Sequence, residues 1–472
     1  MDAKDIDRTA KTTLVEQVMA AVRTQISSRI IGAGARLPSI RRMADKMQVS
    51  KSTVVDAYER LAAEAVIQSR PGSGYYVTKH VPPFTIAPPN TGNDRQVDPV
   101  WMTRQSLSAN SSQLKPGCGW LPASWMPEAE IRRNLRNLAR DQAVNLTDYS
   151  PPNGSLELRT LLSRRISSRG IIAEPGQIML TESGTQAIDL LCRFLLEPGD
   201  VVLLDSPSYF NFHALLRAHR VKVIGVPYRQ NGPDIALFEQ ALMQHKPRLY
   251  ITNSAVHNPT GATLSPATAH RVLKLAERHD LIIIEDDIFA DFEHEPSVRL
   301  AAFDGIERVV HIGSFSKTLS ASLRCGYIVA TPDWIEDLVN LKLATSFGGG
   351  AFSADLVLSL LKDGAYRRHV SGLRNRLAEA MGKVGAKLKS IGITPWTEPD
   401  AGMFLWCQLP AGLDSADVAN VAVKHGLILA PGCAFDVGNQ ASGFMRFNVS
   451  QTLDPAIFPI LEKSMEMVEN KT

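Results

Sequence analysis

A lysine and a run of carboxylates follow two aliphatic stretches that have the composition of buried strands. Lys317 comes shortly after Val309–Ile312, and Glu285-Asp286-Asp287 follow Ile282–Ile284 directly. Carboxylates at the end of a buried strand are costly unless a cation meets them. An amine held near a cation in a desolvated place is a competent nucleophile. Taken alone, however, a lysine at a strand end is usually only a solvated charge.

Three turn motifs accompany these residues. Ser183-Gly184-Thr185-Gln186 follows a strand and opens a helix, so its amides and hydroxyls suit a phosphate, although such a string is more often a plain helix cap. In Asp205–Tyr209 an aromatic ring follows a strand, where a core tyrosine is the common alternative. His257–Gly261 has the composition of a turn and nothing more.

Alternating strands and helices must position these motifs. From about residue 117 onward, short aliphatic runs alternate with amphipathic stretches, a pattern that predicts a mostly parallel α/β sheet. Such sheets bind ligands at the carboxyl ends of their strands, where the motifs lie. The predicted strands are Ile178–Leu180, Val201–Leu204, Val221–Val226, Leu249–Thr252, Ile282–Ile284 and Val309–Ile312.

Composition narrows the class of protein. The chain has 472 residues, 44% of them hydrophobic and 21% charged, which predicts a globular protein with more than one domain. No apolar run approaches the roughly 20 residues that span a bilayer, and the first residues are charged, so we expect a cytoplasmic protein without a membrane partner. The five cysteines are scattered without metal-ligand spacing, so we expect reduced thiols and no metal site.

The front of the chain is basic and has its own pattern. Residues 1–80 hold 13 Lys or Arg against 8 Asp or Glu, a net charge of +5. Helical spacing from Leu14 to Ile26, after the capping box of Thr13 and Glu16, predicts a first helix. Pro38 and Ser39 open a second helix. These features fit a nucleic-acid binder, but a three-helix protein-interaction module fits the periodicity equally well.

The third helix and a hairpin complete this region. Ser50 is a good N-cap for a helix whose first turn carries Lys51, Ser52 and Thr53, which suits a recognition helix in the major groove. A strand over Ala65–Gln68, a Gly-rich turn and the strand Tyr75–Val77 predict a β-hairpin wing. Residues 79–116 then lose all periodicity and collect prolines, which predicts a semi-stiff linker between two domains.

The stretch RLPSIRRMADKMQVSKSTVVDAYERLAAEAVIQSRPGSGYYV closely resembles the winged helix-turn-helix DNA-binding domain of GntR-type bacterial regulators. The resemblance covers residues 12–78 and implies binding to a double-stranded DNA operator. The family often has an arginine where Lys51 stands, and a lysine positions less rigidly than a bidentate arginine. The residues at DNA-contacting positions of the family are Arg41, Lys51, Ser52, Thr53 and Gly72.

Residues 117–470 resemble the class I aminotransferases, because the five strand-end motifs occur in the order and spacing of that family. The resemblance implies the fold-type I α/β fold of pyridoxal-phosphate-dependent transferases, with a mostly parallel central sheet and a smaller C-terminal α+β subdomain. A GntR-type winged helix joined to this domain is the layout of the MocR-type regulators. The complete chain therefore resembles that subfamily.

The resemblance assigns roles to individual residues, with pyridoxal 5'-phosphate as the implied cofactor. Lys317 forms the Schiff base with the aldehyde, Asp286 pairs with the pyridine nitrogen, Asn258 bonds the ring 3' oxygen, and Tyr209 stacks on the ring. The implied phosphate cup contains a tyrosine from the other subunit of a homodimer, expected to be head-to-tail. The cup residues are Ser183, Gly184, Thr185, Gln186, Ser314, Arg324 and Tyr149.

Arg446, in FMRFNVS, matches the family's arginine for a substrate carboxylate, which implies an amino acid or related amino compound as ligand. A solvated strand arginine is the alternative. Two positions depart from the family pattern: Phe289 replaces a tyrosine that donates to the 3' oxygen, and Ala401 precedes Gly402 where a Gly-Gly pair is common. Both departures put efficient turnover in doubt.

These motifs and resemblances leave three hypotheses for the function of the chain. The favoured one is a transcription regulator that holds the cofactor as an internal aldimine at Lys317 and senses an amino acid or amine by aldimine exchange. The second is an active aminotransferase with an appended DNA-binding domain. The third, a sensor of the cofactor itself, needs Lys317 but not Arg446. The near-complete DNA-binding unit over residues 12–78 favours a regulator, and residual transamination is compatible with that role.

Overall fold

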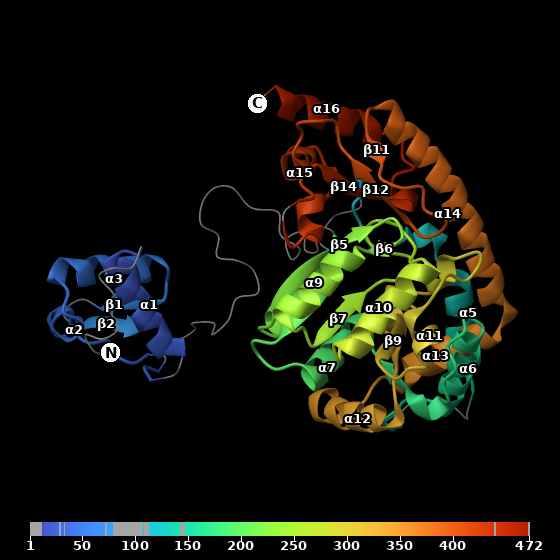
Figure 1. Ribbon diagram of the computed structural model, residues 1–472, viewed down its shortest axis with the longest axis horizontal. Coiled ribbons are helices and arrows are strands. Elements are labelled where there is room, and N and C mark those ends of the chain that lie inside the picture. Colours follow the sequence, from blue (N-terminus) through green and yellow to red (C-terminus); the bar gives the residue numbers. More distant parts are fainter. Residues whose placement is uncertain are drawn as a thin grey trace. The chain divides into compact units, whose positions relative to one another are not determined.

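The computed structural model divides into two compact units, Met1–Pro89 and Asn90–Thr472 (Figure 1). Most of the predicted linker lies outside the described residues. The structure describes residues 12–27, 30–32, 34–70, 73–78, 107, 113–141, 147–438 and 440–470.

The N-terminal unit is three helices and a two-stranded antiparallel hairpin around one small core. Tyr58 lies at its centre, fully buried, with its hydroxyl donating to the Pro38 carbonyl at 3.0 Å. Apolar residues of all three helices and both strands pack around it. The elements are α1 Leu14–Ser27, α2 Ile40–Met47, α3 Lys51–Ala63, β1 Ile67–Arg70 and β2 Gly74–Val77.

The predicted helix starts of this unit are confirmed. Thr13 and Glu16 form the reciprocal capping bonds, and Ser39 and Ser50 cap α2 and α3 through their side chains. The predicted start of the first wing strand was wrong. Ala65 takes the left-handed conformation (φ 56°) and closes the end of α3, so β1 begins two residues later than predicted.

The second unit contains twelve α-helices within its described residues. They are α5 Glu128–Leu138, α6 Leu156–Ser167, α7 Gly184–Leu195, α8 Phe210–Ala218, α9 Ile235–His245, α10 Pro266–Arg278, α11 Leu300–Asp304, α12 Pro332–Ser346, α13 Ala351–Lys362, α14 Gly364–Ser390, α15 Ser415–Lys424 and α16 Ile457–Glu469. Short 3-10 helices are η2 Ala123–Trp125, η3 Pro175–Gln177, η4 Ala290–Phe292, η5 Ala321–Leu323, η6 Gly432–Phe435 and η7 Val449–Gln451.

An eight-stranded sheet forms the larger part of this unit, in the order β3-β10-β9-β8-β7-β4-β5-β6. Apolar residues of α6, α9, α10 and α13 cover one face, and those of α7, α8 and α12 cover the other. Its strands are β3 Ile178–Thr181, β4 Val201–Ser206, β5 Lys222–Arg229, β6 Gly232–Pro233, β7 Leu249–Thr252, β8 Ile282–Asp286, β9 Val309–Ser314 and β10 Gly326–Val329.

The predicted parallel arrangement is confirmed for β5, β4, β7, β8 and β9. Strand β10 was not predicted, and it runs antiparallel to both β3 and β9. The connection from β9 to β10 explains this, because it carries only the short η5 helix and a parallel crossover needs a dozen or more residues.

A four-stranded antiparallel sheet in the order β11-β12-β14-β13 forms the smaller part of the unit (Figure 1). It shares a core with α14, α15 and α16, as expected for an α+β subdomain. Its strands are β11 Thr394–Pro395, β12 Phe404–Gln408, β13 Ala430–Pro431 and β14 Phe444–Asn448. Within the described residues, no helix combines the length and the apolar character that a bilayer crossing needs.

Strand β10 supports the start of α7 through a close backbone approach. A Cβ placed on Gly326 would lie 2.8 Å from the Ser183 carbonyl carbon and 3.0 Å from the Gly184 nitrogen. Real Cβ atoms do not come this close, so the lack of a side chain at Gly326 lets α7 begin directly above the strand. The position of the first turn of α7 therefore depends on this glycine.

We predict that Gly326→Ala destabilises the second unit by about 1–3 kcal/mol, because an added methyl group must push backbone away. Thermal unfolding measures this. The matched control is Gly176→Ala, because no atom lies within 4 Å of a Cβ at Gly176. Equal melting temperatures for the two variants would contradict the proposed close approach.

Candidate functional site

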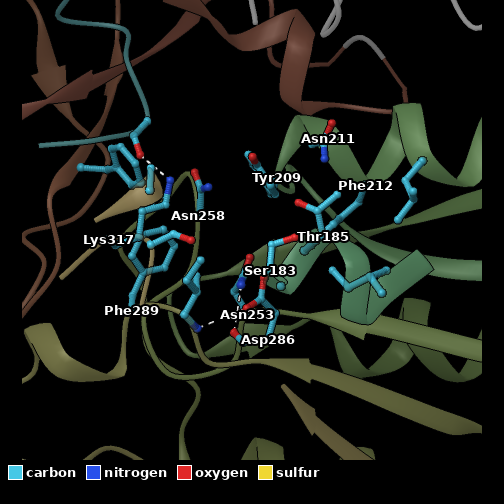
Figure 2. A pocket seen from close by; sticks show the side chains of 18 of the residues that line it. Ser183, Thr185, Tyr209, Asn211, Phe212, Asn253, Asn258, Asp286, Phe289 and Lys317 are labelled. Carbon is cyan, nitrogen blue, oxygen red and sulfur yellow. Dashed lines mark hydrogen bonds between the residues drawn. The ribbon is translucent and has the colours of Figure 1, made fainter. Parts of the chain in front are cut away.

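A cavity of about 190 Å³ lies at the carboxyl ends of the strands of the eight-stranded sheet (Figure 2). Residues from five strand ends and from the smaller sheet line it. Many of the residues singled out in the sequence meet here. Those that line the cavity are Ser183, Gly184, Thr185, Tyr209, Asn258, Asp286, Lys317, Arg324 and Arg446.

Three other predicted residues do not line the cavity. The Gln186 side chain accepts a hydrogen bond from the Glu182 amide at 2.7 Å and so braces the turn before α7. The Ser314 hydroxyl donates to the Cys325 carbonyl at 3.1 Å. Tyr149 is 82% exposed in the single chain and packs edge-on against Phe347.

Lys317 reaches the cavity from the loop after β9. Its Nζ donates a hydrogen bond to the Gly119 carbonyl at 2.6 Å. Burial and, to a smaller degree, the charge of Arg446 lower the pKa of Lys317 to about 8. At neutral pH the unprotonated amine, which is the nucleophilic form, is therefore still the minority but far more abundant than in an ordinary lysine.

Asp286 is the last residue of β8, and its side chain lies in the cavity wall. Burial raises the pKa of its carboxyl to about 6, although a hydrogen bond from the Ile288 amide at 3.1 Å opposes the shift. Asn253, at the end of β7, donates to the Asp286 carbonyl at 2.9 Å. A cation brought next to this buried carboxylate would gain a partner that water does not screen.

Arg446 enters from β14 of the smaller sheet and is only 1% exposed. Its guanidinium donates to Asn258 Oδ1 at 2.9 Å and to the Gly117 carbonyl at 2.8 Å, and it lies 4.1 Å from the ring centre of Phe404. Burial lowers its pKa to about 10. These two bonds use two of the five N–H donors of the guanidinium, so the group retains capacity for an anion, although its Nε is buried without a hydrogen-bond partner within the described residues.

The first turn of α7 forms a third polar wall. Ser183 caps the helix by accepting from the Gln186 amide at 3.1 Å, and Gly184 and Thr185 line the cavity. Arg324, held in the left-handed conformation (φ 47°), lines the same cavity. Helix-end amides beside a guanidinium form an anion site.

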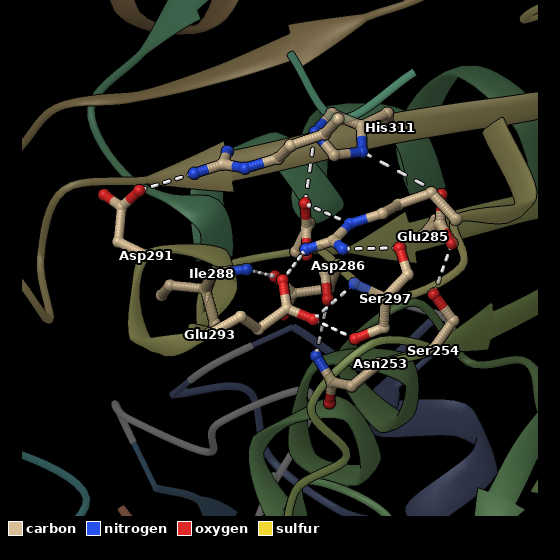
Figure 3. A network of polar contacts seen from close by, with 12 residues as sticks. Asn253, Ser254, Glu285, Asp286, Ile288, Asp291, Glu293, Ser297 and His311 are labelled. Atoms are coloured by element: carbon tan, nitrogen blue, oxygen red, sulfur yellow. Dashed lines mark hydrogen bonds and ion pairs between the residues drawn. The ribbon is translucent and has the colours of Figure 1, made fainter. Parts of the chain in front are cut away.

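The other two carboxylates of the acidic run serve the fold (Figure 3). Glu285 accepts hydrogen bonds from the first amides of α11, at 2.7 and 2.9 Å, and from the Ser254 hydroxyl. Asp287 accepts two bonds from the buried Arg299, which also pairs with Glu293. Of the three acidic residues in this run, only Asp286 lines the cavity.

Several lining residues were not singled out in the sequence. Asn253 directly follows a predicted strand, so the strand-end rule was sufficient to find it. Phe404 gave no such signal, because apolar residues fill every strand of this domain. Gly119 contributes a backbone carbonyl, and a sequence pattern does not indicate which carbonyl faces a site.

The predicted DNA-binding residues lie on α2 and α3 of the N-terminal unit. Arg41, Lys51 and Ser52 are exposed, and Thr53 is half-buried. The Ser50 hydroxyl contacts those of Ser52 and Thr53 at 2.7 and 2.8 Å, so both hydroxyls belong to the capping arrangement. Gly72 lies outside the described residues.

No group of His, Cys, Asp and Glu side chains in the described part of the chain is arranged to hold a metal ion. The chain matches two families: aminotransferase class I and II over residues 112–457, and the bacterial regulatory proteins of the gntR family over residues 14–77.

Solved aminotransferases share the fold. LysN, the α-aminoadipate aminotransferase of Thermus thermophilus, was solved with N-(5'-phosphopyridoxyl)-L-leucine and superposes with a TM-score of 0.71 at 25% identity, over 79% of this chain and 96% of its own. The kynurenine aminotransferase of Pyrococcus horikoshii, solved with PMP, also gives 0.71 at 25% identity, over 80% and 96%.

Curated relatives match the chain over both domains. YdcR, an HTH-type transcriptional regulator of Escherichia coli, is 28% identical over 92% of this chain and 94% of its own. NorG, an HTH-type transcriptional regulator of Staphylococcus aureus, is 27% identical over 80% and 87%. The chain belongs to the aminotransferase class I and II family and carries a GntR-type helix-turn-helix domain in front of it, which is the organisation of the MocR-type transcription regulators.

Proposed function

We propose that this chain is a DNA-binding transcription regulator that holds pyridoxal phosphate at Lys317 and senses an amino acid or related amine there. The convergence of Lys317, Asp286 and Arg446 in one buried cavity carries the proposal. The match of residues 14–77 to a family of DNA-binding regulators supports the regulatory part.

The cavity fits the cofactor in three respects. The first turn of α7 and Arg324 form an anion site for the phosphate. Burial raises the pKa of Asp286 and so disfavours its carboxylate, and a protonated pyridine nitrogen beside it would favour the carboxylate again. Asn258 accepts from Arg446 through Oδ1, which leaves its amide nitrogen to donate to the ring oxygen. When bound, the cofactor supplies an aldehyde that attaches covalently to a primary amine.

This chain's own residues select the ligand. The Lys317 amine, with its lowered pKa, is the group that attaches the aldehyde and is displaced by an incoming amine. Arg446 lines the same cavity and uses only two of its five N–H donors, so it is the proposed partner of the ligand's carboxylate. To regulate, the ligand must favour one arrangement of the protein over another.

The alternative is an active aminotransferase with an appended DNA-binding domain. The presence of Lys317, Asp286 and Arg446 in one cavity favours some turnover. Phe289 also lines the cavity and carries no hydroxyl, so hydrogen bonding to the ring oxygen falls to Asn258. Release of a keto acid on adding an amino acid distinguishes this alternative from a sensor.

A homodimer completes the proposal. Tyr149 is strongly exposed and contacts the similarly exposed Phe347, which gives this face an aromatic pair for a second copy to cover. We propose that Tyr149 joins the phosphate site of the other subunit in a head-to-tail dimer.

We predict that Lys317→Ala abolishes the visible absorbance band that appears when pyridoxal phosphate attaches covalently to the protein. The reason is that, among the residues lining the cavity, Lys317 alone carries a primary amine. The control is Lys362→Ala, which removes an exposed lysine paired with Glu157 and should keep the band. A band that persists in Lys317→Ala would move the attachment to another lysine.

We predict that Lys51→Ala weakens DNA binding about fivefold at about 0.15 M salt and reduces the salt slope by about one, as expected for the loss of one phosphate contact. Binding is measured with duplexes selected by the unaltered protein from a random pool. Lys383→Ala, on the exposed face of α14, is the control and should bind normally. Unchanged binding by Lys51→Ala would refute the docking of α3.

A further inference from the structure

The segment 113–120 runs along the smaller sheet of the second unit. Leu114 donates to the Gly426 carbonyl at 3.0 Å and accepts from the Ile428 amide at 2.9 Å. Gly117 donates to the Ile428 carbonyl at 2.9 Å, and a Cβ there would lie 2.4 Å from the Leu429 carbonyl carbon. The segment is therefore pressed against residues 426–430 with no room for a side chain at Gly117.

Asn448, at the end of β14, fixes the middle of this segment. It is fully buried, and its amide nitrogen donates to the carbonyls of Cys118 at 3.0 Å and Trp120 at 2.9 Å. Its backbone amide donates to the Pro116 carbonyl at 2.7 Å, and its Oδ1 accepts from Ser450. Asn448 thus holds the carbonyls on both sides of Gly119.

Gly119, between those two carbonyls, receives a hydrogen bond from the other sheet. Lys317 follows β9 of the eight-stranded sheet and donates from Nζ to the Gly119 carbonyl at 2.6 Å. This bond joins the cavity's reactive amine to a segment that is otherwise anchored on the smaller sheet. A free lysine ammonium has three N–H donors. A lysine nitrogen attached through a C=N bond keeps at most one N–H donor, and the C=N bond fixes the position of that nitrogen.

We propose that Asn448 is a positioning residue that presents the Gly119 carbonyl to Lys317, so that segment 113–120 reports whether Lys317 is free. The inference rests on the proposed function. When an aldehyde attaches, water leaves, a C=N bond to Lys317 forms, and Gly119 loses its donor. When a primary amine takes its place, a C=N bond to the incoming nitrogen forms and the one to Lys317 breaks. Two protons pass from the incoming nitrogen to Lys317, which again donates to Gly119.

The position of segment 113–120 in the chain explains how the bond between Lys317 and Gly119 could affect regulation. The linker was predicted over residues 79–116, but Leu114 and Pro116 are already hydrogen-bonded to the second unit, so segment 113–120 begins within its predicted end. A change in the hydrogen bonding of Gly119 therefore occurs where the chain enters the aminotransferase-like fold. An amine that frees Lys317 acts on this entry point without having to contact the N-terminal unit.

Hydrogen exchange of the full-length protein tests the proposal on peptides that cover 113–121. Three states are compared: no cofactor, pyridoxal phosphate added, and pyridoxal phosphate followed by methoxyamine. Methoxyamine displaces Lys317 but has no carboxylate for Arg446. We expect exchange in this segment to become roughly threefold to tenfold faster when the cofactor attaches, the range for losing one hydrogen bond, and to slow again with methoxyamine.

Asn448→Asp tests the positioning role, because it keeps the side-chain shape and the oxygen that faces Ser450 but removes both donors to the segment. We expect this variant to show the cofactor band and fast exchange of the segment in all three states. The matched control is Asn134→Asp. It makes the same change at a buried asparagine that bonds to Glu130 and Ser359, and should respond like the unaltered protein.

Three outcomes would overturn the inference. If the absorbance band forms and responds to methoxyamine while exchange of 113–121 stays constant, the inference fails and the proposed function survives. If Asn448→Asp responds like Asn134→Asp, Asn448 has no positioning role and the inference fails. If no band forms with the unaltered protein, the proposed function fails and the inference fails with it.

Discussion

The burial of three ionisable groups around one cavity is the constraint on which the second unit depends. Asp286 and Arg446 are buried and Lys317 is half-buried, and burial is the largest cause of the pKa shift of each. Buried charge is tolerated only where partners are fixed in advance. The edge of a mostly parallel sheet meets this demand, because strand ends, helix starts and backbone carbonyls converge there from rigid elements.

Each of the two sheets supplies some of these ionisable groups. The eight-stranded sheet supplies Lys317 and Asp286, and the smaller sheet supplies Arg446. Arg446 reaches back to Asn258, and Lys317 reaches across to the carbonyl of Gly119. Both bonds link residues that are far apart in sequence, so a ligand that competes for either donor changes how the two sheets are tied together. In the proposed function, the amine of such a ligand frees Lys317 to donate to Gly119 again, and its carboxylate competes for Arg446.

Sequence patterns predicted most elements that build the site. The predicted strand starts were correct for β3, β4, β7, β8 and β9, but only β7 ends where predicted, because polar residues such as Glu285 and Asp286 continue the strand beyond its aliphatic run. The antiparallel strand β10 was not predicted, because buried strands of either direction have the same composition. The pattern also did not separate Asp286 from Glu285 and Asp287. Successive side chains of a strand point to opposite faces, so Asp286 faces the cavity while the side chains before and after it do not. Residues distant in sequence donate hydrogen bonds to the other two carboxylates.

Backbone groups mark the limit of such predictions. The carbonyls of Gly117 and Gly119 contact Arg446 and Lys317, yet a carbonyl is present at every residue and carries no signal. The sequence does show Gly117, whose missing side chain lets segment 113–120 lie against residues 426–430. A fold that brings a reactive amine to a backbone carbonyl can use the state of that amine as a signal. In the proposed function, the covalent chemistry that serves an aminotransferase also suits a regulator, because exchange at one nitrogen would alter a hydrogen bond at the entry to the domain.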